Sequence, residues 1–195
     1  MSRPSVHIRP ARLDDAEELH ALWQPSARPA AGEEALSEIS SAVRRALASD
    51  RERIVVAEYA GRVAGVVHLR LGTFGPLASE QAVFVSHLCV APDLRRRGVA
   101  RGLMQAATTW AEEQAVAHVL AFSAVGQREG NRFMARLGLA PAATVRIAPT
   151  AVLRAKLPVE VPGMVAKTHP TSSSRQLGQV LAQRRSARRH QRVGG

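Results

Sequence analysis

The chain has 195 residues, of which 46% are hydrophobic and 22% are charged. This composition is typical of one soluble domain with an appendage, and it excludes collagen-like, low-complexity and coiled-coil proteins. Cys89 is the single cysteine, and the seven histidines form no metal-binding spacing such as HExxH. Disulfide frameworks and the common zinc sites are therefore excluded, and we expect no metal.

The net charge of +11 is unevenly distributed along the chain. Seven basic and no acidic residues follow residue 164, so the preceding part carries only 20 basic against 16 acidic residues. Arginine outnumbers lysine 25 to 2, which base composition of the genome explains as well as selection for arginine chemistry does. We expect residues 172–195 to bind an acidic partner, nucleic acid being the commonest. A solvated tail without a partner is the alternative.

Targeting and membrane signals are missing from the sequence. No apolar run approaches the roughly 18 residues of a membrane span, and the first residues lack the apolar core of a signal peptide. We therefore expect a cytoplasmic protein that does not bind membranes.

The first half of the chain predicts strand, helix, helix and then a sheet. Residues 5–9 alternate as a short strand, and Asp14 with Glu17 has the capping spacing that opens a helix over residues 16–23. A loop over 25–32 precedes an amphipathic helix, whose apolar positions are Leu36, Ile39, Val43 and Leu47.

Three valine-rich runs then predict an antiparallel sheet. Residues 53–59 and 62–71 flank the Ala60-Gly61 turn as a hairpin, and residues 81–90 add a third strand.

The second half alternates helices and strands. A helix of about four turns is predicted from Gly98, followed by a strand over 117–122 and a helix over 127–137. Residues 144–147 are expected to form a last strand. Residues 149–157 fit a helix better than a strand, because Pro149 suits a first helical turn.

These elements predict an α/β domain over residues 1–158. Residues 159–195 form a second segment, in which prolines and the Ser172-Ser173-Ser174 run make a linker to an arginine-rich tail compatible with a helix.

The turn between the strand over 81–90 and the helix after it is the most informative segment. It reads Leu88-Cys89-Val90-Ala91-Pro92-Asp93-Leu94-Arg95-Arg96-Arg97-Gly98-Val99-Ala100. Unpaired N–H groups at a helix start attract anions, and glycine permits close approach of a ligand to the backbone, so a di- or polyphosphate is the natural ligand. The turn differs from the P-loop, since no GK[ST] follows, and from the dinucleotide GxGxxG.

This segment resembles the GNAT-type N-acetyltransferase family. Arg95-x-x-Gly98-x-Ala100 matches the family's Gln/Arg-x-x-Gly-x-Gly/Ala turn, and Leu88, Val90 and Pro92 match the strand before it. Downstream, Phe133-Met134-Ala135-Arg136-Leu137-Gly138-Leu139 is similar to the family's Phe-Tyr-x-x-Leu-Gly-Phe. The order of elements agrees over about three quarters of the chain.

The resemblance implies a splayed mixed sheet of about six to seven strands flanked by helices, with acetyl-coenzyme A inserted between the fourth and fifth strands. The backbone near Leu88 and Val90 would hold the pantetheine arm, and the amides of residues 96–101 the pyrophosphate. The expected cofactor-binding residues are Leu88, Cys89, Val90, Arg95, Arg96, Arg97, Gly98, Val99, Ala100, Arg101, Gln127, Asn131 and Phe133. Gln127 stands where the family has an asparagine, and Asn131 is the alternative for that role.

The catalytic residues depart from the family pattern. Met134 occupies the position of the family's tyrosine acid and cannot donate a proton, so water is left as the acid. No carboxylate lies in the middle of the fourth strand, which leaves His87 as the base and Ser86 as a second candidate. A histidine satisfied by its neighbours is the competing interpretation of His87, and it applies more strongly to His68. Cys89 fits packing better than covalent catalysis.

Three functions compete on these observations. The first is transfer of acetyl from acetyl-coenzyme A to a primary amine of a small molecule or protein, by direct attack in a ternary complex. The second is a non-catalytic acetyl-coenzyme A-binding regulator. The third is a nucleic-acid- or ribosome-associated protein that uses the basic tail. The acceptor is not specified by the sequence, and the oligomeric state is open, a dimer included.

Overall fold

The computed structural model describes residues 5–23, 33–73, 80–123 and 127–157. Contacts divide the chain into two units, Met1–Ala142 and Ala143–Gly195. The domain boundary expected after residue 158 stays a prediction. The loop expected over 25–32 and the basic segment 172–195 lie outside the described residues, so the partner expected for that segment also stays a prediction.

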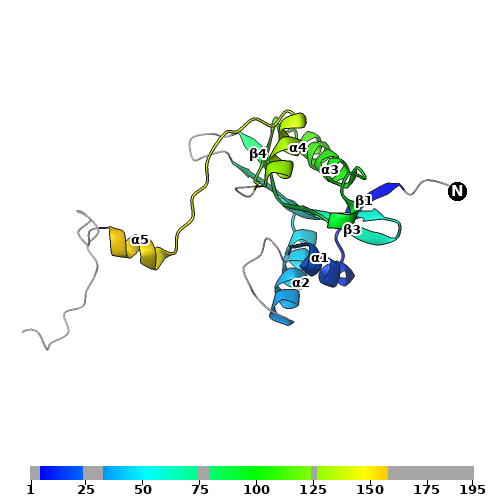
Figure 1. Ribbon diagram of the computed structural model, residues 1–195, viewed down its shortest axis with the longest axis horizontal. Coiled ribbons are helices and arrows are strands. Elements are labelled where there is room, and N and C mark those ends of the chain that lie inside the picture. The colour runs from blue at the N-terminus through cyan, green and yellow to red at the C-terminus, as the bar shows by residue number, and fades with distance from the viewer. Residues whose placement is uncertain (1–4, 24–32, 74–79, 124–126, 158–195) are drawn as a thin grey trace, which may run out of the picture. The chain divides into compact units, whose positions relative to one another are not determined.

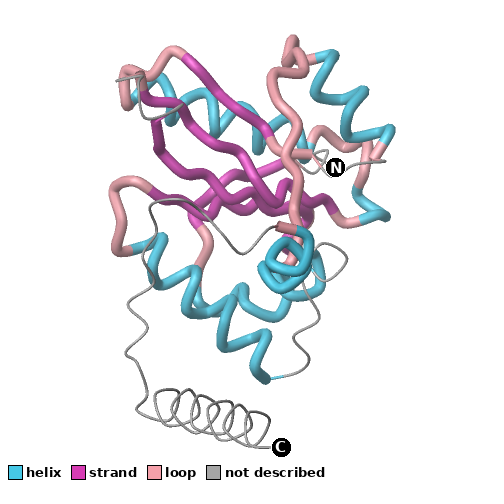
Figure 2. The backbone as a smooth tube through the Cα atoms, turned by 90° about the vertical axis from the view of Figure 1, so that its left-hand side faces the viewer, coloured by secondary structure: helices cyan, strands magenta, loops and turns pink. Residues whose placement is uncertain are grey.

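The first unit is built on a five-stranded mixed sheet (Figure 2). The strands are β1 (Val6–Pro10), β2 (Glu52–Tyr59), β3 (Arg62–Thr73), β4 (Gln81–Val90) and β5 (His118–Ala121), and they lie side by side in chain order. The pairs from β1 to β4 are antiparallel, whereas β4 and β5 are parallel. The mixed α/β fold is as expected, but the described residues hold five strands rather than six to seven.

Helices cover both faces of this sheet (Figure 1). Helices α1 (Ala16–Trp23) and α2 (Glu33–Leu47) lie on one face, and α3 (Val99–Glu113) with α4 (Arg128–Arg136) lies on the other. Successive strand residues point to opposite faces, so β3 supplies Val66 to the core under α1 and α2 and Val67 to the core under α3. Trp110 of α3 and Leu19 of α1 are fully buried in these two cores.

The β2–β3 hairpin contains an irregularity that matters for the site. Its turn residues Ala60 and Gly61 have φ values of 51° and 79°, as in the tight hairpin turns that match strand twist. The register then shifts between Ala57 and Glu58, so that Ile54 pairs with His68. Each side chain of β2 before the shift therefore lies on the other face of the sheet from the one it would have in a hairpin without the shift.

Two sequence-based expectations need correction. Residues 144–147 form no strand: Val145 and Ile147 are exposed, and alternation alone does not make a strand where no neighbouring strand pairs with it. The chain entering α1 is capped by Asp15 rather than Asp14, since the Arg12 backbone N–H donates to Asp15 Oδ2 at 2.7 Å. The helix expected over 149–157 is confirmed as α5 (Thr150–Lys156) in the second unit.

Within the described part of the chain, no helix combines the length and apolar character needed to cross a bilayer.

A buried ion cluster ties β1 to β2 and to the start of α1. Arg9 donates to both carboxylate oxygens of Asp15, at 2.7 and 2.8 Å, and its Nε donates to Glu58 Oε1 at 2.7 Å. The Arg9 and Asp15 side chains are only 10% and 7% exposed. Burial pushes the pKa of Asp15 up, but the hydrogen bonds from Arg9 and Arg12 and the charge of Arg9 outweigh it, so the pKa is lowered from 3.8.

We expect Asp15→Asn to destabilise the protein, because it leaves the buried Arg9 charge without its main partner. Loss of one member of such a pair costs about 3 to 5 kcal/mol, measured by urea unfolding at pH 7. Because the folded pKa of Asp15 is depressed, its stabilising contribution is complete above pH 3.8 and is lost as the pH falls through the folded value. The difference between the two proteins should therefore shrink in acid.

The matched control is Glu113→Gln, which removes the exposed Arg53–Glu113 ion pair at 3.1 Å. An exposed pair contributes about 0 to 1 kcal/mol, so this variant should unfold almost like the parent. Equal losses in the two variants would contradict the role assigned to Asp15.

Candidate active site

A β-bulge at His87 shapes the middle of the sheet. Val66 pairs with Cys89 and His68 with Ser86, so His87 and Leu88 of β4 stand opposite the single residue Val67 of β3. His87 adopts a φ of 52°, in the left-handed region that non-glycine residues rarely occupy. Such bulges bend a strand and re-aim a side chain, and this one turns the His87 ring toward α1.

Strands β4 and β5 separate just before this bulge. Their pairing runs from Ala82 with His118 to Val85 with Ala121, and Phe122 N donates to Val85 O at 2.9 Å. The pairing with β5 ends at Val85, whereas β4 itself continues to Val90. The sheet therefore opens between β4 and β5 at this point.

Residues 91–98, which we call the arginine turn, connect β4 to α3 at the far end of this opening. After the 3-10 turn Pro92–Leu94, Arg96 and Gly98 have φ values of 62° and 88°. Gly98 is the N-cap of α3, no side chain caps the helix, and its first turn carries no acidic residue. Arg95, Arg96, Arg97 and Arg101 are all exposed. The turn thus presents uncapped N–H groups among four cations, which suits an anion.

Close packing fixes the start of α3 on the sheet. A Cβ atom at Gly65 of β3 would lie 2.7 Å from Val99 Cγ1 and 2.8 Å from the Cys89 carbonyl oxygen. Only glycine allows β3 to approach both the bulge and the first helical residue this closely. The side chain of Val99, although expected at the cofactor site, is buried in the core.

Four side chains from three neighbouring strands form one hydrogen-bonded chain, which we call the polar chain. Glu52 Oε1 lies 2.7 Å from His68 Nε2, His68 Nδ1 lies 2.9 Å from Ser86 Oγ, and Ser86 Oγ lies 3.1 Å from His87 Nδ1. His68 and Ser86 alternate with core residues of the α3 face, so the polar chain lies on the face covered by α1 and α2.

The ring of His87 lies between Trp23 of α1 and His68. The ring centroids are 6.0 Å apart for Trp23 and 6.2 Å apart for His68. Trp23 Nε1 also donates to the His87 carbonyl oxygen at 3.0 Å, which holds the bulge against α1. Loss of water around the ring, and to a smaller extent the charge of His68, lowers the pKa of His87 below 6.5. His87 is therefore uncharged at neutral pH.

The remaining expected site residues fall into two groups. Leu88, Val90 and Phe133 pack against the core under α3, as Met134 does, and Cys89 packs against the core under α1 and α2. Gln127 is the N-cap of α4, and Asn131 Oδ1 accepts a hydrogen bond from Ser123 Oγ at 2.7 Å. A long ion pair of 3.5 Å joins Arg95 to Glu129 of α4.

Sequence reasoning did not single out Glu52 or Trp23, and it took His68 for a histidine satisfied by its neighbours, which agrees with the bonds of its ring to Glu52 and Ser86. His68 and Ser86 are direct cross-strand partners, but Glu52 reaches His68 only because the hairpin register shifts. A regular hairpin would place Arg53 opposite His68. The available signal was the pair of neighbouring polar residues Ser86 and His87 within an otherwise apolar strand.

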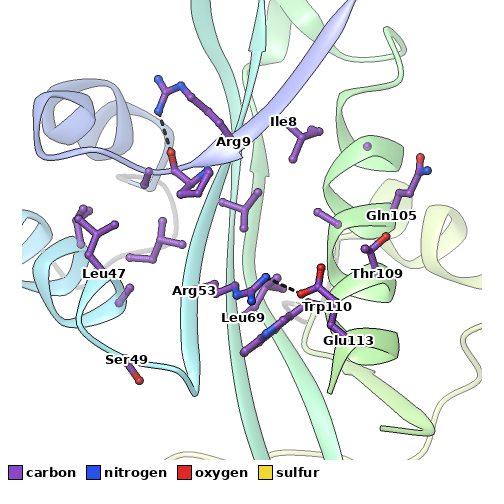
Figure 3. A pocket seen from close by; sticks show the side chains of 18 residues that line it. Ile8, Arg9, Leu47, Ser49, Arg53, Leu69, Gln105, Thr109, Trp110 and Glu113 are labelled. Carbon is purple, nitrogen blue, oxygen red and sulfur yellow. Dashed lines mark hydrogen bonds and ion pairs between the residues drawn. The ribbon is translucent and has the colours of Figure 1, made fainter. Parts of the chain in front are cut away.

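A separate pocket of about 590 Å³ lies between α2, the β1–β2 edge and α3 (Figure 3). Arg53 stacks 4.9 Å from the centroid of the Trp110 ring and pairs with Glu113. Neither the arginine turn nor any side chain of the polar chain lines this pocket, although residues of β2, the strand that carries Glu52, do. No cluster of three metal-ligating side chains occurs among the described residues.

Comparison with known families decides the classification. The model of the acetyltransferase (GNAT) family matches residues 16–139, which include the polar chain, the bulge and the arginine turn. The chain belongs to the GNAT acetyltransferase family. No protein with a curated description matches it.

Several solved structures share the fold at low sequence identity. A transcriptional regulator from Bacillus halodurans C-125 is 16% identical with a TM-score of 0.66, covering 74% of this chain and 99% of its own. The aminoglycoside N-acetyltransferase AAC(6')-Iy in complex with CoA is 18% identical with a TM-score of 0.63, covering 76% and 96%. Glucosamine-6-phosphate N-acetyltransferase from Arabidopsis thaliana is 14% identical with a TM-score of 0.60, covering 75% and 99%.

Proposed function

We propose that this GNAT protein transfers the acetyl group of acetyl-coenzyme A to a primary amine by direct attack in a ternary complex. The observation that carries the proposal is the position of His87. Its uncharged imidazole lies in the bulge just beyond the point where β4 and β5 separate, and the uncapped start of α3 follows β4 after the arginine turn.

Acetyl-coenzyme A fits the donors on this path. Its pyrophosphate needs N–H donors and cations, which the start of α3 and Arg95, Arg96, Arg97 and Arg101 supply. Its pantetheine arm needs an extended polar edge, and the end of β4 at Leu88 and Val90, beyond the last pair with β5, lies beside the opening that such an arm would occupy. The coenzyme complex of the aminoglycoside N-acetyltransferase supports the same ligand class.

His87 serves as the general base. The acetyl thioester supplies an electrophilic carbonyl carbon and a thiolate leaving group. His87 removes a proton from the acceptor amine, and an uncharged imidazole is able to do so at neutral pH. Met134 has no proton to donate, so water protonates the departing thiolate, whose ordinary pKa is about 8.5.

Aromatic side chains beside the polar chain would contact the carbon skeleton of the acceptor. Phe84 and Phe122 stack with their centroids 6.1 Å apart, and Arg70 lies 5.6 Å over the Phe84 ring. Phe122 is about half exposed. Neighbours acting on an aminoglycoside and on glucosamine-6-phosphate support an amine acceptor, and a protein amino group is the alternative.

A non-catalytic acetyl-coenzyme A-binding regulator is the second candidate. It is favoured by Met134, which packs against the core under α3 in place of an acid, and by the structural likeness to a transcriptional regulator. This candidate requires cofactor binding but no turnover.

The proposal is tested by screening amines with acetyl-coenzyme A and following release of the thiol. The parent protein should acetylate at least one amine, and His87→Gln should lower kcat by about 100-fold or more, as expected for loss of a general base. Calorimetry with coenzyme A is the control and should give similar affinities for both proteins. Coenzyme A binding without acetylation of any amine would favour the regulator.

The proposed pyrophosphate site at the start of α3 is tested by Gly98→Ala, with Gly61→Ala as its matched control. Both glycines have positive φ, 88° and 79°, and a Cβ at either position meets no atom within 4 Å. The two variants therefore carry a similar backbone penalty, but only Gly98 lies at the start of α3. We expect calorimetry to show at least about tenfold weaker coenzyme A binding, or 1.4 kcal/mol, for Gly98→Ala only. Equal affinities of the two variants for coenzyme A would contradict a pyrophosphate site at Gly98.

The acid position is tested by Met134→Tyr. The variant adds a hydroxyl at the position where the family has its tyrosine, so we expect kcat to stay the same or rise, and the parent enzyme to show no alkaline limb from a side-chain acid. Steady-state rates across pH would measure this. If turnover disappeared while coenzyme A still bound, Met134 would have a packing or substrate role instead.

A further inference from the structure

The hydrogen-bond polarity of the polar chain sets the tautomer of His87. A carboxylate only accepts hydrogen bonds, so His68 Nε2 donates to Glu52 across their 2.7 Å contact. If His68 carries only this one ring proton, its Nδ1 has a lone pair that accepts the Ser86 hydroxyl proton across 2.9 Å. Ser86 has no second proton to give. Across the remaining 3.1 Å contact, His87 Nδ1 must therefore donate to Ser86 Oγ.

We propose that Glu52, His68 and Ser86 are positioning residues that hold His87 with Nδ1 protonated and Nε2 free, and that they conduct the proton it receives. The tautomer follows from the hydrogen bonds together with a singly protonated His68, whereas the proton transfer rests on the proposed acetyltransferase function.

The transfer balances as follows. The amine nitrogen bonds to the acetyl carbon, the carbon–sulfur bond breaks, and the thiolate leaves with the electron pair. The amine proton passes to His87 Nε2. His87 Nδ1 gives its proton to Ser86 Oγ, and Ser86 gives its own hydroxyl proton to His68 Nδ1. His87 ends neutral with its proton on Nε2, and the positive charge ends on His68.

His68 is the better place for that charge. Its Nε2 lies 2.7 Å from the Glu52 carboxylate, and both side chains are about three quarters buried, so the imidazolium would be partnered where water screens little. His87 faces Trp23 of α1, Ser86 and His68, and none of these is a carboxylate. Moving the proton along the polar chain therefore separates it from the site of attack.

The tautomer is measured by nitrogen NMR on protein labelled at histidine, without substrate, with His87→Gln used to assign the signals. We expect His87 Nδ1 to be protonated in the parent and in Ser86→Thr, which keeps the hydroxyl. Ser86→Ala should lose this preference. Ser49→Ala, which removes a hydroxyl remote from the histidines and bonded to the Arg51 N–H, should match the parent. A parent signal from His87 protonated at Nε2 overturns the proposal, whether or not the protein has activity.

The proton conduction is measured on the amine found in the screen. Glu52→Gln should lower kcat/KM about tenfold, a part of the roughly 100- to 10,000-fold that a general base contributes. Loss of the carboxylate also makes a proton on the histidine pair less stable, so the acidic limb of the pH profile should move to lower pH. Glu113→Gln is the control and should change neither.

Two outcomes would contradict this proposal while leaving the acetyltransferase function intact. One is a Glu52→Gln profile that falls in height without moving its acidic limb, which indicates a structural role. The other is an acetyl group on Ser86 detected by intact-protein mass spectrometry, which would make Ser86 a nucleophile activated by His68.

Discussion

The bulge that sets His87 and Leu88 against Val67 is the constraint on which the site depends. It follows directly on the last bond between β4 and β5, so the sheet opens where a histidine is forced into a left-handed conformation. That conformation costs free energy, which the surrounding contacts must offset. Trp23 of α1 holds the His87 carbonyl, and Ser86, itself bonded to His68 of β3, holds the ring, so helix α1 and strand β3 both help to stabilise the strained residue.

The two faces of the sheet have different tasks within the proposed function. The face under α3 is apolar and carries the helix whose start meets the phosphates, whereas the face under α1 and α2 carries the polar chain. The opening between β4 and β5 connects them. A donor and an acceptor bound from opposite faces would meet at the bulge without competing for the same side chains.

Much of the fold could be predicted from the sequence because its signals are local. The Ala60-Gly61 turn, the valine-rich runs and the Gly98 helix start each lie within a few residues of the structure they determine. The place of Glu52 in the polar chain could not be predicted, because it depends on a register shift at Ala57 that no local pattern marks. Residues 144–147 show the converse: their alternation suits a strand, but a strand also needs a partner.

Gly65 fixes the distance between the end of β4 and the start of α3. Because Gly65 packs closely on both the Cys89 carbonyl oxygen, just after the bulge, and Val99 at the start of α3, the two ends of the proposed cofactor path cannot shift independently. Within the proposed function, the spacing between the phosphate site and the thioester site is then set by the protein, not by the ligand. A coenzyme fragment truncated in its pantetheine arm would satisfy one end or the other, but never both.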